Sequence, residues 1–145
     1  MSPKRITDLI DDSETLAAFC AQMSGSSYIT VDTEFIRDRT YWPRLCLVQV
    51  ANHDLARAVD PLAVDLDLTP LTELLANPKV IKVFHAARQD VEIFVNQNSA
   101  VPTPMFDTQI AAMVCGFGDS VGYDRLVEKL AGAHIDKGSR FTDWS

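Results

Sequence analysis

The spacing of hydrophobic positions along the chain predicts helices and strands in a mixed order. Apolar residues recur at helical spacing from Leu16 to Met23, after a capping candidate at Asp12 and before Gly25. β-Branched and aromatic residues then predict a strand over 28–35. The same reasoning predicts further strands over 45–50, 55–59, 80–84 and 105–106, and further helices over 69–75, 86–95, 108–114 and 123–130.

The order of these elements predicts an α/β fold. One helix precedes a meander of three strands, and the rest of the chain alternates helices with two further strands. This order favours a mixed sheet with flanking helices. The sequence contains no internal repeat and no linker, so we expect residues 1–145 to form one domain. Nothing periodic follows His134, and the ending Phe141 to Ser145 looks like the start of another element. We therefore expect the domain to be incomplete at its C-terminus.

Composition and charge narrow the class of protein. Hydrophobic residues make up 47% and charged residues 23%, which is typical of a globular chain. The 13 basic and 20 acidic residues give a net charge of −7, which argues against binding nucleic acid through bulk charge. No signal peptide or membrane-length apolar run is present, so we expect a cytoplasmic protein. We interpret Cys20, Cys46 and Cys115 as reduced core residues, with a metal or redox role as the less favoured alternative.

Two carboxylates stand two positions apart near the end of the first predicted strand. Because side chains alternate along a strand, Asp32 and Glu34 leave the same face, with their Cα atoms about 6–7 Å apart. Adjacent unneutralised carboxylates repel each other, and a divalent cation removes that repulsion by ligation. Oxygen ligands of this kind suit Mg²⁺ or Mn²⁺. The alternative is a strand end with two solvated acids.

Asp90 is the third candidate. It lies in the first turns of the helix predicted after the strand over 80–84. If that strand adjoins the strand bearing Asp32 and Glu34, the helix start lies near the two carboxylates. The alternative is that Asp90 only interacts with the positive end of its own helix.

Several segments together resemble the ribonuclease D family of DEDD-type 3′-5′ exonucleases. The order and spacing of the segments match over nearly the whole chain, which is far more specific than Asp-Thr-Glu alone. The matching segments are Val31-Asp32-Thr33-Glu34-Phe35 with Arg37 and Thr40-Tyr41-Trp42-Pro43, Leu45-Cys46-Leu47-Val48-Gln49, Val83-Phe84-His85-Ala86-Ala87-Arg88-Gln89-Asp90-Val91-Glu92-Ile93-Phe94, Phe106-Asp107-Thr108-Gln109-Ile110-Ala111-Ala112, and Ser139-Arg140-Phe141-Thr142-Asp143-Trp144-Ser145.

This resemblance implies a ribonuclease H-like (DnaQ-like) fold and 3′-5′ hydrolysis of RNA with two divalent cations, Mg²⁺ or Mn²⁺. Asp32 resembles the carboxylate that contacts both metals, and Glu34 the ligand of the nucleophile-side metal. Asp90 resembles the aspartate that serves the other metal through water. The substrate implied is the 3′ end of single-stranded RNA, such as a tRNA precursor.

The chain departs from the family at the third motif, which places a tyrosine three or four residues before a fourth aspartate. Tyr123 and Asp124 are adjacent and precede the lead-in to that motif, so we do not accept them as a substitute. We expect the third motif beyond Ser145, and this chain alone to be nearly inactive.

Other residues are nucleotide-binding candidates. The resemblance assigns this role to Thr33, Phe35, His85 and Arg88, although Phe35 could equally be core and His85 structural. Asp107 is expected to cap a helix, with support of the site as the alternative. The loop after the first strand interleaves basic and aromatic side chains, as RNA binding requires, although its rings could instead pack on the sheet; these residues are Arg37, Arg39, Tyr41, Trp42 and Arg44.

Two main hypotheses of different class follow. Asp32, Glu34 and Asp90 favour a metal-dependent 3′-5′ exoribonuclease. The absent third motif favours a non-catalytic nucleic-acid-binding or scaffold module with the same fold. A DNA-directed exonuclease is a third, weaker alternative, because the sequence does not reveal which sugar is recognised.

Overall fold

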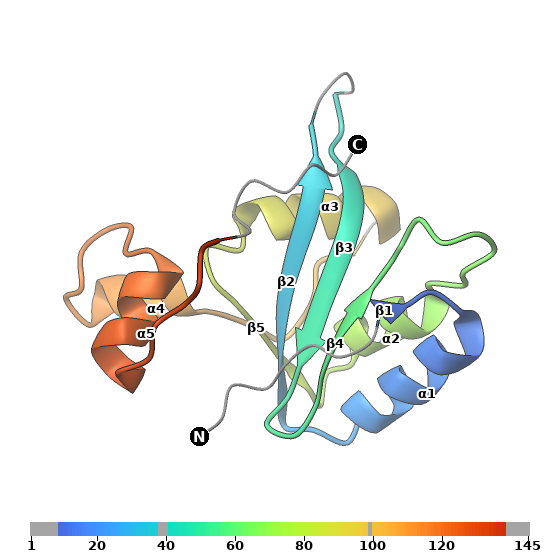
Figure 1. The fold of residues 1–145 in the computed structure, drawn as a ribbon, viewed down its shortest axis with the longest axis horizontal. Helices are drawn as coiled ribbons and strands as arrows, with labels where there is room; N and C mark the ends of the chain where they lie inside the picture. The colour runs from blue at the N-terminus through green and yellow to red at the C-terminus, as the bar shows by residue number, and fades with distance from the viewer. Residues whose placement is uncertain (1–8, 38–40, 99, 139–145) are drawn as a thin grey trace.

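The computed structural model describes residues 9–37, 41–98 and 100–138, and its centre is a six-stranded sheet. Helices α1, α2 and α3 lie behind this sheet in Figure 1, while α4 and α5 lie to one side, beyond β5. In chain order the elements are β1 (Leu9–Ile10), α1 (Ser13–Met23), β2 (Tyr28–Ile36), β3 (Arg44–Ala51), β4 (Ala56–Val59), α2 (Thr69–Ala76), β5 (Ile81–Phe84), α3 (Arg88–Asn98), β6 (Met105–Asp107), α4 (Thr108–Val114) and α5 (Tyr123–Ala131).

The sheet is mixed, as the element order predicts. Its strand order is β1-β4-β3-β2-β5-β6. The meander pairs β2 with β3 and β3 with β4 in antiparallel fashion, whereas β1 joins β4, β5 joins β2 and β6 joins β5 in parallel. The α/β class and the adjacency of β2 and β5 are therefore confirmed.

The structure also differs from the sequence-based expectations in detail. It adds β1, a two-residue strand for which no period can be recognised. The short strand β6 is confirmed and ends at Asp107. Arg39 and residues 139–145, on which some predictions depend, lie outside the described residues.

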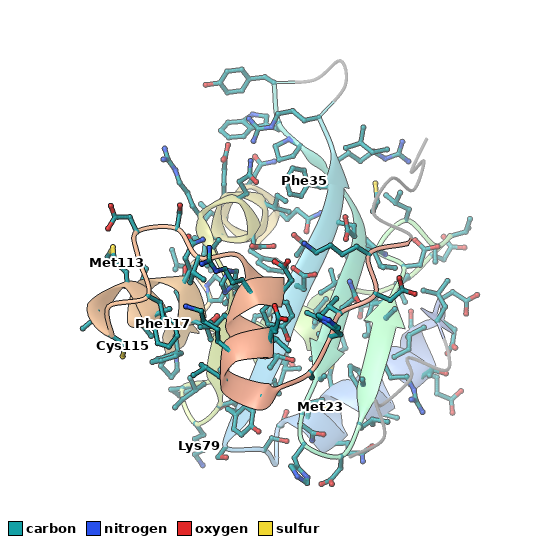
Figure 2. All side chains as sticks on the ribbon, turned by 60° about the vertical axis from the view of Figure 1, so that its left-hand side comes forward. Met23, Phe35, Lys79, Met113, Cys115 and Phe117 are labelled. Carbon is teal, nitrogen blue, oxygen red and sulfur yellow. The ribbon has the colours of Figure 1, made fainter. Side chains whose placement is uncertain are left out.

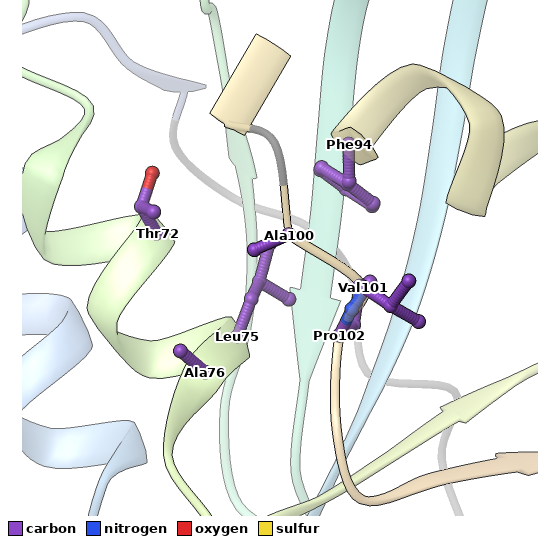
Figure 3. A pocket seen from close by; sticks show the side chains of 7 residues that line it. All are labelled: Thr72, Leu75, Ala76, Phe94, Ala100, Val101 and Pro102. Carbon is purple, nitrogen blue, oxygen red and sulfur yellow. The ribbon is translucent and has the colours of Figure 1, made fainter. Parts of the chain in front are cut away.

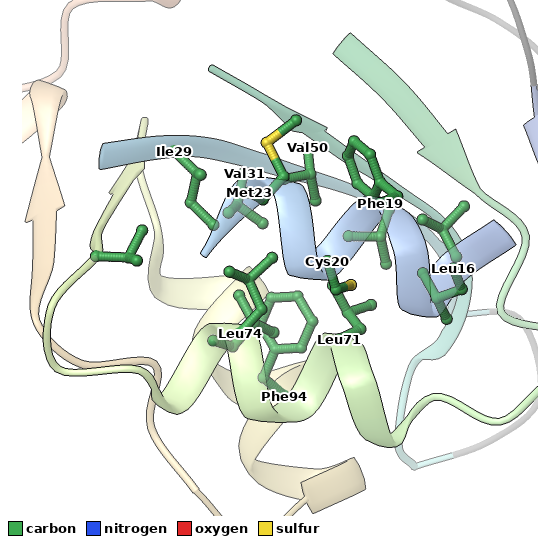
Figure 4. Close-up of a cluster of buried hydrophobic side chains, with 14 of the residues drawn as sticks. Leu16, Phe19, Cys20, Met23, Ile29, Val31, Val50, Leu71, Leu74 and Phe94 are labelled. Carbon is green, nitrogen blue, oxygen red and sulfur yellow. The ribbon is translucent and has the colours of Figure 1, made fainter. Parts of the chain in front are cut away.

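The main hydrophobic core lies between the sheet and α1, α2 and α3. Leu16, Phe19, Cys20 and Met23 of α1 are all buried, as their helical spacing predicts. Figure 4 shows them packed around side chains from β2, β3, α2 and α3, including Ile29, Val31, Val50, Leu71, Leu74 and Phe94. The opposite face of β2 carries Tyr28, Thr30 and Asp32, which are exposed.

A second, small cluster joins α4 and α5. Its buried residues are Ala112, Val121 and Leu126, with Phe117 packed against them. Figure 2 shows Met113, Cys115 and Phe117 on α4 and the turn that follows it, away from the sheet. Cys115 is exposed, so its assignment to the core was wrong; it follows a short helix with a single buried residue. Cys20 and Cys46 are buried as expected, and burial raises the pKa of Cys20 to about 12.

Lys82 in β5 is a fully buried cation held by backbone oxygens. Its exposed fraction is 0%, and its Nζ donates hydrogen bonds to the carbonyl oxygens of Asn77 and Val80, each at 2.8 Å. A third bond reaches the carbonyl oxygen of Thr103. Burial lowers the pKa of Lys82. The ammonium therefore ties the end of α2 and the segment before β6 to β5.

A crevice behind the sheet is too small for a ligand. Figure 3 shows it between α2, α3 and the segment before β6, lined by Leu75, Phe94 and Pro102 among others. Its volume is about 10 Å³, at the lower limit for a single water molecule.

Among the described residues, no helix has the length and apolar character that crossing a membrane requires.

Candidate active site

The alternation of β2 places Asp32 on the open face of the sheet. Val31 and Thr33 on either side of it are buried, and Asp32 is exposed. Glu34 follows on the same side of the strand and is half-buried. The expected same-face arrangement of Asp32 and Glu34 thus agrees with the burial pattern.

A β-bulge lies directly after Glu34. The partner of Glu34 in β3 is Leu47, but the partner of Phe35 is Leu45, so the register skips Cys46. Bulges bend a strand and increase its twist, and they commonly lie beside functional sites, where they redirect side chains. The bulge therefore changes the direction of the hairpin immediately beyond the carboxylates.

Asp32 lines an open cleft of about 610 Å³ on this face. That volume lies within the usual range for small-ligand sites. Residues from β2, β3, β4 and β5 form its floor, and α4 and α5 contribute to its edge. The lining residues are Thr30, Val31, Asp32, Gln49, Val50, Ala51, Ala56, Arg57, Val83, Phe84, His85, Thr108 and Tyr123.

Asp90 is bound to β2 through Thr33. Asp90 lies in the first turn of α3 and is 8% exposed. The hydroxyl of Thr33 donates a short hydrogen bond to Oδ1 of Asp90, at 2.5 Å. Since the Thr33 side chain is buried on the side of β2 opposite to Asp32, this bond fixes the helix carboxylate behind the strand that carries the other two.

The three carboxylates raise one another's pKa. For Asp32 the causes are desolvation and then the charge of Glu34; for Glu34 they are desolvation and then the charge of Asp90. Desolvation is also the main cause of the raised pKa of Asp90; the Thr33 bond opposes it, and the charge of Asp32 adds to it. The site thus concentrates negative charge that a cation would neutralise.

The donor set is chemically suited to a hard divalent cation, because every candidate ligand is a carboxylate oxygen. Within residues 9–37, 41–98 and 100–138, however, no group of three or more histidine, cysteine, aspartate or glutamate side chains is arranged to hold a metal ion. Asp32 and Glu34 are therefore the pair that fits direct ligation. Asp90, held by Thr33, fits an indirect role.

His85 lies in the cleft wall at the end of β5 and is held at both ring nitrogens. Nδ1 lies 2.8 Å from the hydroxyl oxygen of Thr108, and Nε2 lies 2.9 Å from the carbonyl oxygen of Val121. Since a carbonyl can only accept, Nε2 carries a hydrogen. The ring of Tyr123 is 5.5 Å away, centroid to centroid. These contacts connect the cleft wall to α4 and α5.

Asp107 joins two segments of the site. Its carboxylate accepts hydrogen bonds from the backbone N–H groups of Ala86 and Ala87, before α3, and of Gln109 and Ile110, in α4. Ala86 has a φ of 58°, in the left-handed region that non-glycine residues rarely adopt. Asp107 therefore caps α4, as predicted, and also stabilises the turn between His85 and α3.

We expect Asp107→Ala to lower the free energy of unfolding by about 2 kcal/mol at neutral pH, the upper end for loss of a helix cap. Burial alone would raise the pKa of Asp107, but its N–H donors outweigh burial and hold the pKa below the usual 3.8. The stabilisation is thus present above that value and is lost as the pH falls through the lowered pKa. Urea unfolding at neutral and acid pH measures both effects. The exposed Asp119→Ala serves as control, and an equal loss at both pH values would contradict this account.

The remaining predicted site residues have varied surroundings. Thr33 is buried against Asp90, so its hydroxyl does not line the cleft. Phe35 is half-buried against the main core (Figure 2), and Arg88 is exposed at the start of α3. Sequence reasoning did not assign Gln49 or Tyr123 to the cleft. Gln49 could have been found, because it is the polar residue that alternates with Val48 and Val50, whereas Tyr123 reaches the cleft only through the packing of α5.

Comparisons with known proteins concern the family and the fold. Residues 7–145 match a family model described as 3′-5′ exonuclease. The Ribonuclease D of Granulibacter bethesdensis is 60% identical over 137 residues, covering 94% of this chain and 35% of that protein. The Ribonuclease D of Zymomonas mobilis is 54% identical over 142 residues, with 97% and 36% covered. This chain therefore spans little more than a third of the length of these relatives.

Solved structures show the same fold. Escherichia coli RNase D superimposes with a TM-score of 0.89 at 37% identity, covering 94% of this chain and 36% of that one. Trypanosoma brucei RNase D in complex with RNA gives a TM-score of 0.76 at 21% identity, covering 92% and 49%. The likeness to the E. coli structure confirms the ribonuclease D-type exonuclease fold. At 21% identity, the likeness to the Trypanosoma brucei structure concerns the fold alone.

Proposed function

Since the chain belongs to the 3′-5′ exonuclease family, we propose that it carries the carboxylates of a metal-dependent exoribonuclease that removes nucleotides from RNA 3′ ends. The observation that carries this proposal is the pairing of Asp32 with Glu34 on the open side of β2. Their pKa values are raised by burial and by neighbouring carboxylates, as expected for a site whose negative charge a bound cation would neutralise. Residues 1–145 would then belong to the exonuclease domain of a longer family architecture.

The preference for RNA over DNA rests on the relatives. The matching curated proteins are named Ribonuclease D, and the E. coli structure is described as an exoribonuclease involved in structured RNA processing. We therefore propose single-stranded RNA 3′ ends, such as those of tRNA precursors, as the substrate.

Each residue of the candidate site would have a separate role in this reaction. Asp32 and Glu34 would hold divalent cations, Mg²⁺ or Mn²⁺, which when bound lower the pKa of water and stabilise charge on a phosphodiester. Asp90, fixed by Thr33, would orient solvent at the site. His85 and Tyr123 border the cleft in which the terminal nucleotide would lie, and contacts at both ring nitrogens of His85 fix the orientation of its ring. Phe35 and Arg88, beside these carboxylates, would contact the nucleotide.

A non-catalytic binding module is the second candidate. It is favoured by the finding that no trio of ligands within the described residues is close enough to hold a metal ion. Under this alternative the cleft binds RNA in the absence of divalent cations and releases no nucleotides.

We expect Asp32→Asn to abolish Mn²⁺ binding in calorimetric titration, whereas Asp119→Asn should bind as the wild type does. The two variants lose the same charge, but only Asp32 lies in the cleft; Asp119 is exposed in the turn after α4. The affected step is metal binding, because Asp32 supplies an oxygen ligand that an amide replaces poorly.

The same variants test the activity. Labelled RNA incubated with Mn²⁺ and excess protein should lose nucleotides from its 3′ end with wild type and Asp119→Asn, and not with Asp32→Asn. A DNA strand of the same sequence separates the RNA-directed from the DNA-directed alternative. Identical titrations for both variants, or RNA binding that is equal in chelator and in Mn²⁺, would refute the metal-dependent exonuclease and favour the binding module.

A further inference from the structure

We infer that the side-chain amide of Gln49, in the floor of the cleft, recognises the ribose 2′-hydroxyl of the terminal nucleotide and thereby selects RNA over DNA. This inference rests on the proposed function and deepens it, because it names the residue that would distinguish the two sugars. Gln49 has no role in the cation site or among the nucleotide contacts proposed above.

Gln49 lies directly beside Asp32 in the sheet. The two residues are paired across the antiparallel strands β2 and β3, and both line the cleft. The side chains of such a pair leave the same face of the sheet, with their Cβ atoms about 4.5–5.5 Å apart. The corresponding partner of Glu34 is Leu47, which has no polar side-chain group. Of these two cross-strand partners, only Gln49 can therefore form a hydrogen bond with a ligand through its side chain.

The amide of Gln49 is available to such a ligand. Gln49 is half-buried, and within the described part of the chain its side chain forms no hydrogen bond. Among the described residues that are not exposed, no side-chain nitrogen or oxygen is both fully buried and unpartnered, so this amide is accessible to solvent. The hydroxyl of Thr108 and both ring nitrogens of His85, in the same cleft, are instead bound within the protein.

An amide matches a ribose hydroxyl better than it matches a phosphate. The amide offers a carbonyl oxygen as acceptor and an NH₂ group as donor, and a hydroxyl can take part in both kinds of bond. A phosphate only accepts, and the proposed function already provides for it at Asp32 and Glu34. In a nucleotide whose phosphate lies at Asp32, the ribose is bonded directly to that phosphate and the base lies farther away. The 2′-hydroxyl is also the group by which a protein can distinguish RNA from DNA.

The test compares the wild type with Gln49→Met, which keeps the length of the side chain and removes the amide. The ligands are a 5′-fluorescent uridine octanucleotide and a deoxy-ended strand, which differs only in a single deoxyuridine at its 3′ end. We expect the wild type to bind the all-ribose strand roughly 5-fold more tightly, the factor that a net hydrogen bond contributes. Gln49→Met should bind both strands as weakly as the wild type binds the deoxy-ended strand. Affinities are measured by fluorescence anisotropy in Mn²⁺, and a gel confirms that the strands stay intact.

Two controls separate sugar recognition from a loss of structure. Gln22→Met makes the same replacement at an exposed position of α1, behind the sheet in Figure 1, and should retain the preference for the all-ribose strand. A strand whose single deoxyuridine lies at the 5′ end should bind to each protein as the all-ribose strand does, because the effect belongs to the terminal sugar alone.

The possible outcomes separate this inference from the proposed function. If binding requires Asp32 but the wild type does not distinguish the two strands, or Gln49→Met still does, the role of Gln49 alone is overturned. Equal weakening of both strands by Gln49→Met leaves the preference in place and has the same meaning. A change confined to the preference between strands ending in uridine and in adenosine would assign the amide to the base and would also overturn it. Absence of octanucleotide binding by the wild type would overturn both proposals.

Discussion

Fusing residues 1–145 to the segment that follows the matched region in the Ribonuclease D of Granulibacter bethesdensis should raise the rate of 3′-end degradation by on the order of 10³-fold. The family resemblance implies a third motif in that segment, with a fourth aspartate and a tyrosine. The described residues of this chain offer Asp32, Glu34 and Asp90, with only the first two on the open side of β2. A fourth carboxylate would complete the ligand set, and the tyrosine would orient the attacking water.

Each of these contributions concerns positioning in the transition state. A misplacement of about 1 Å can cost roughly 10²-fold in rate, and effects within one catalytic unit are not additive. The measurement is the release of nucleotides from 3′-labelled RNA with Mn²⁺, at equal concentrations of the chain and of the fusion. A fusion carrying Asp32→Asn serves as control for rate contributed by contaminating nucleases. Equal rates for chain and fusion, both abolished by Asp32→Asn, would mean that another residue of this chain completes the site.

Lys82→Met should lower the free energy of unfolding by about 3 kcal/mol, the cost expected when a buried polar network loses its donor. Methionine fills a similar volume but cannot donate to the carbonyl oxygens of Asn77, Val80 and Thr103. These oxygens come from the end of α2, the approach to β5 and the segment before β6, and the bond to Val80 is fully buried.

The control for this prediction is Lys79→Met, three positions earlier in the chain. Lys79 is exposed (Figure 2), so its replacement should change stability by less than about 0.5 kcal/mol. Urea unfolding followed by circular dichroism measures both variants. Similar midpoints for Lys82→Met and wild type would show that the three carbonyl oxygens do not depend on the ammonium.

Local periodicity was sufficient to predict the class of sheet and the order of all described elements except β1. The spacing of Leu16, Phe19 and Met23 defines a helix face, and the alternation of Val31, Asp32 and Thr33 defines two strand faces, because both patterns repeat within a few residues. β1 has only two residues, so no period exists to recognise. Lys82 was included in an otherwise apolar strand, but nothing in the local pattern indicates that the carbonyl oxygens of Asn77, Val80 and Thr103 surround its ammonium.

For the candidate site, the features set by local alternation were likewise predictable from the sequence, and the long-range contacts were not. Alternation places Asp32 and Glu34 on one face, and the neighbouring strand brings α3 close to them. The bond between Thr33 and Asp90 joins residues 57 positions apart, and it depends on how deeply α3 packs behind β2. The double role of Asp107 likewise arises only when β6 lies beside β5. Such long-range contacts follow from tertiary packing, which local patterns do not encode.

The end of β4 at Val59 has a mechanical consequence for the two carboxylates. Asp32 is paired with Gln49, which is itself paired with Ala58 of β4, so this row of the sheet is supported by a third strand. The row of Glu34 has no neighbour beyond β3, because β4 ends at Val59, opposite Val48. The two carboxylates therefore lie on either side of a boundary between a stiff sheet and a two-stranded ribbon. Bending of that ribbon would change the separation of Asp32 and Glu34 while leaving the floor of the cleft in place.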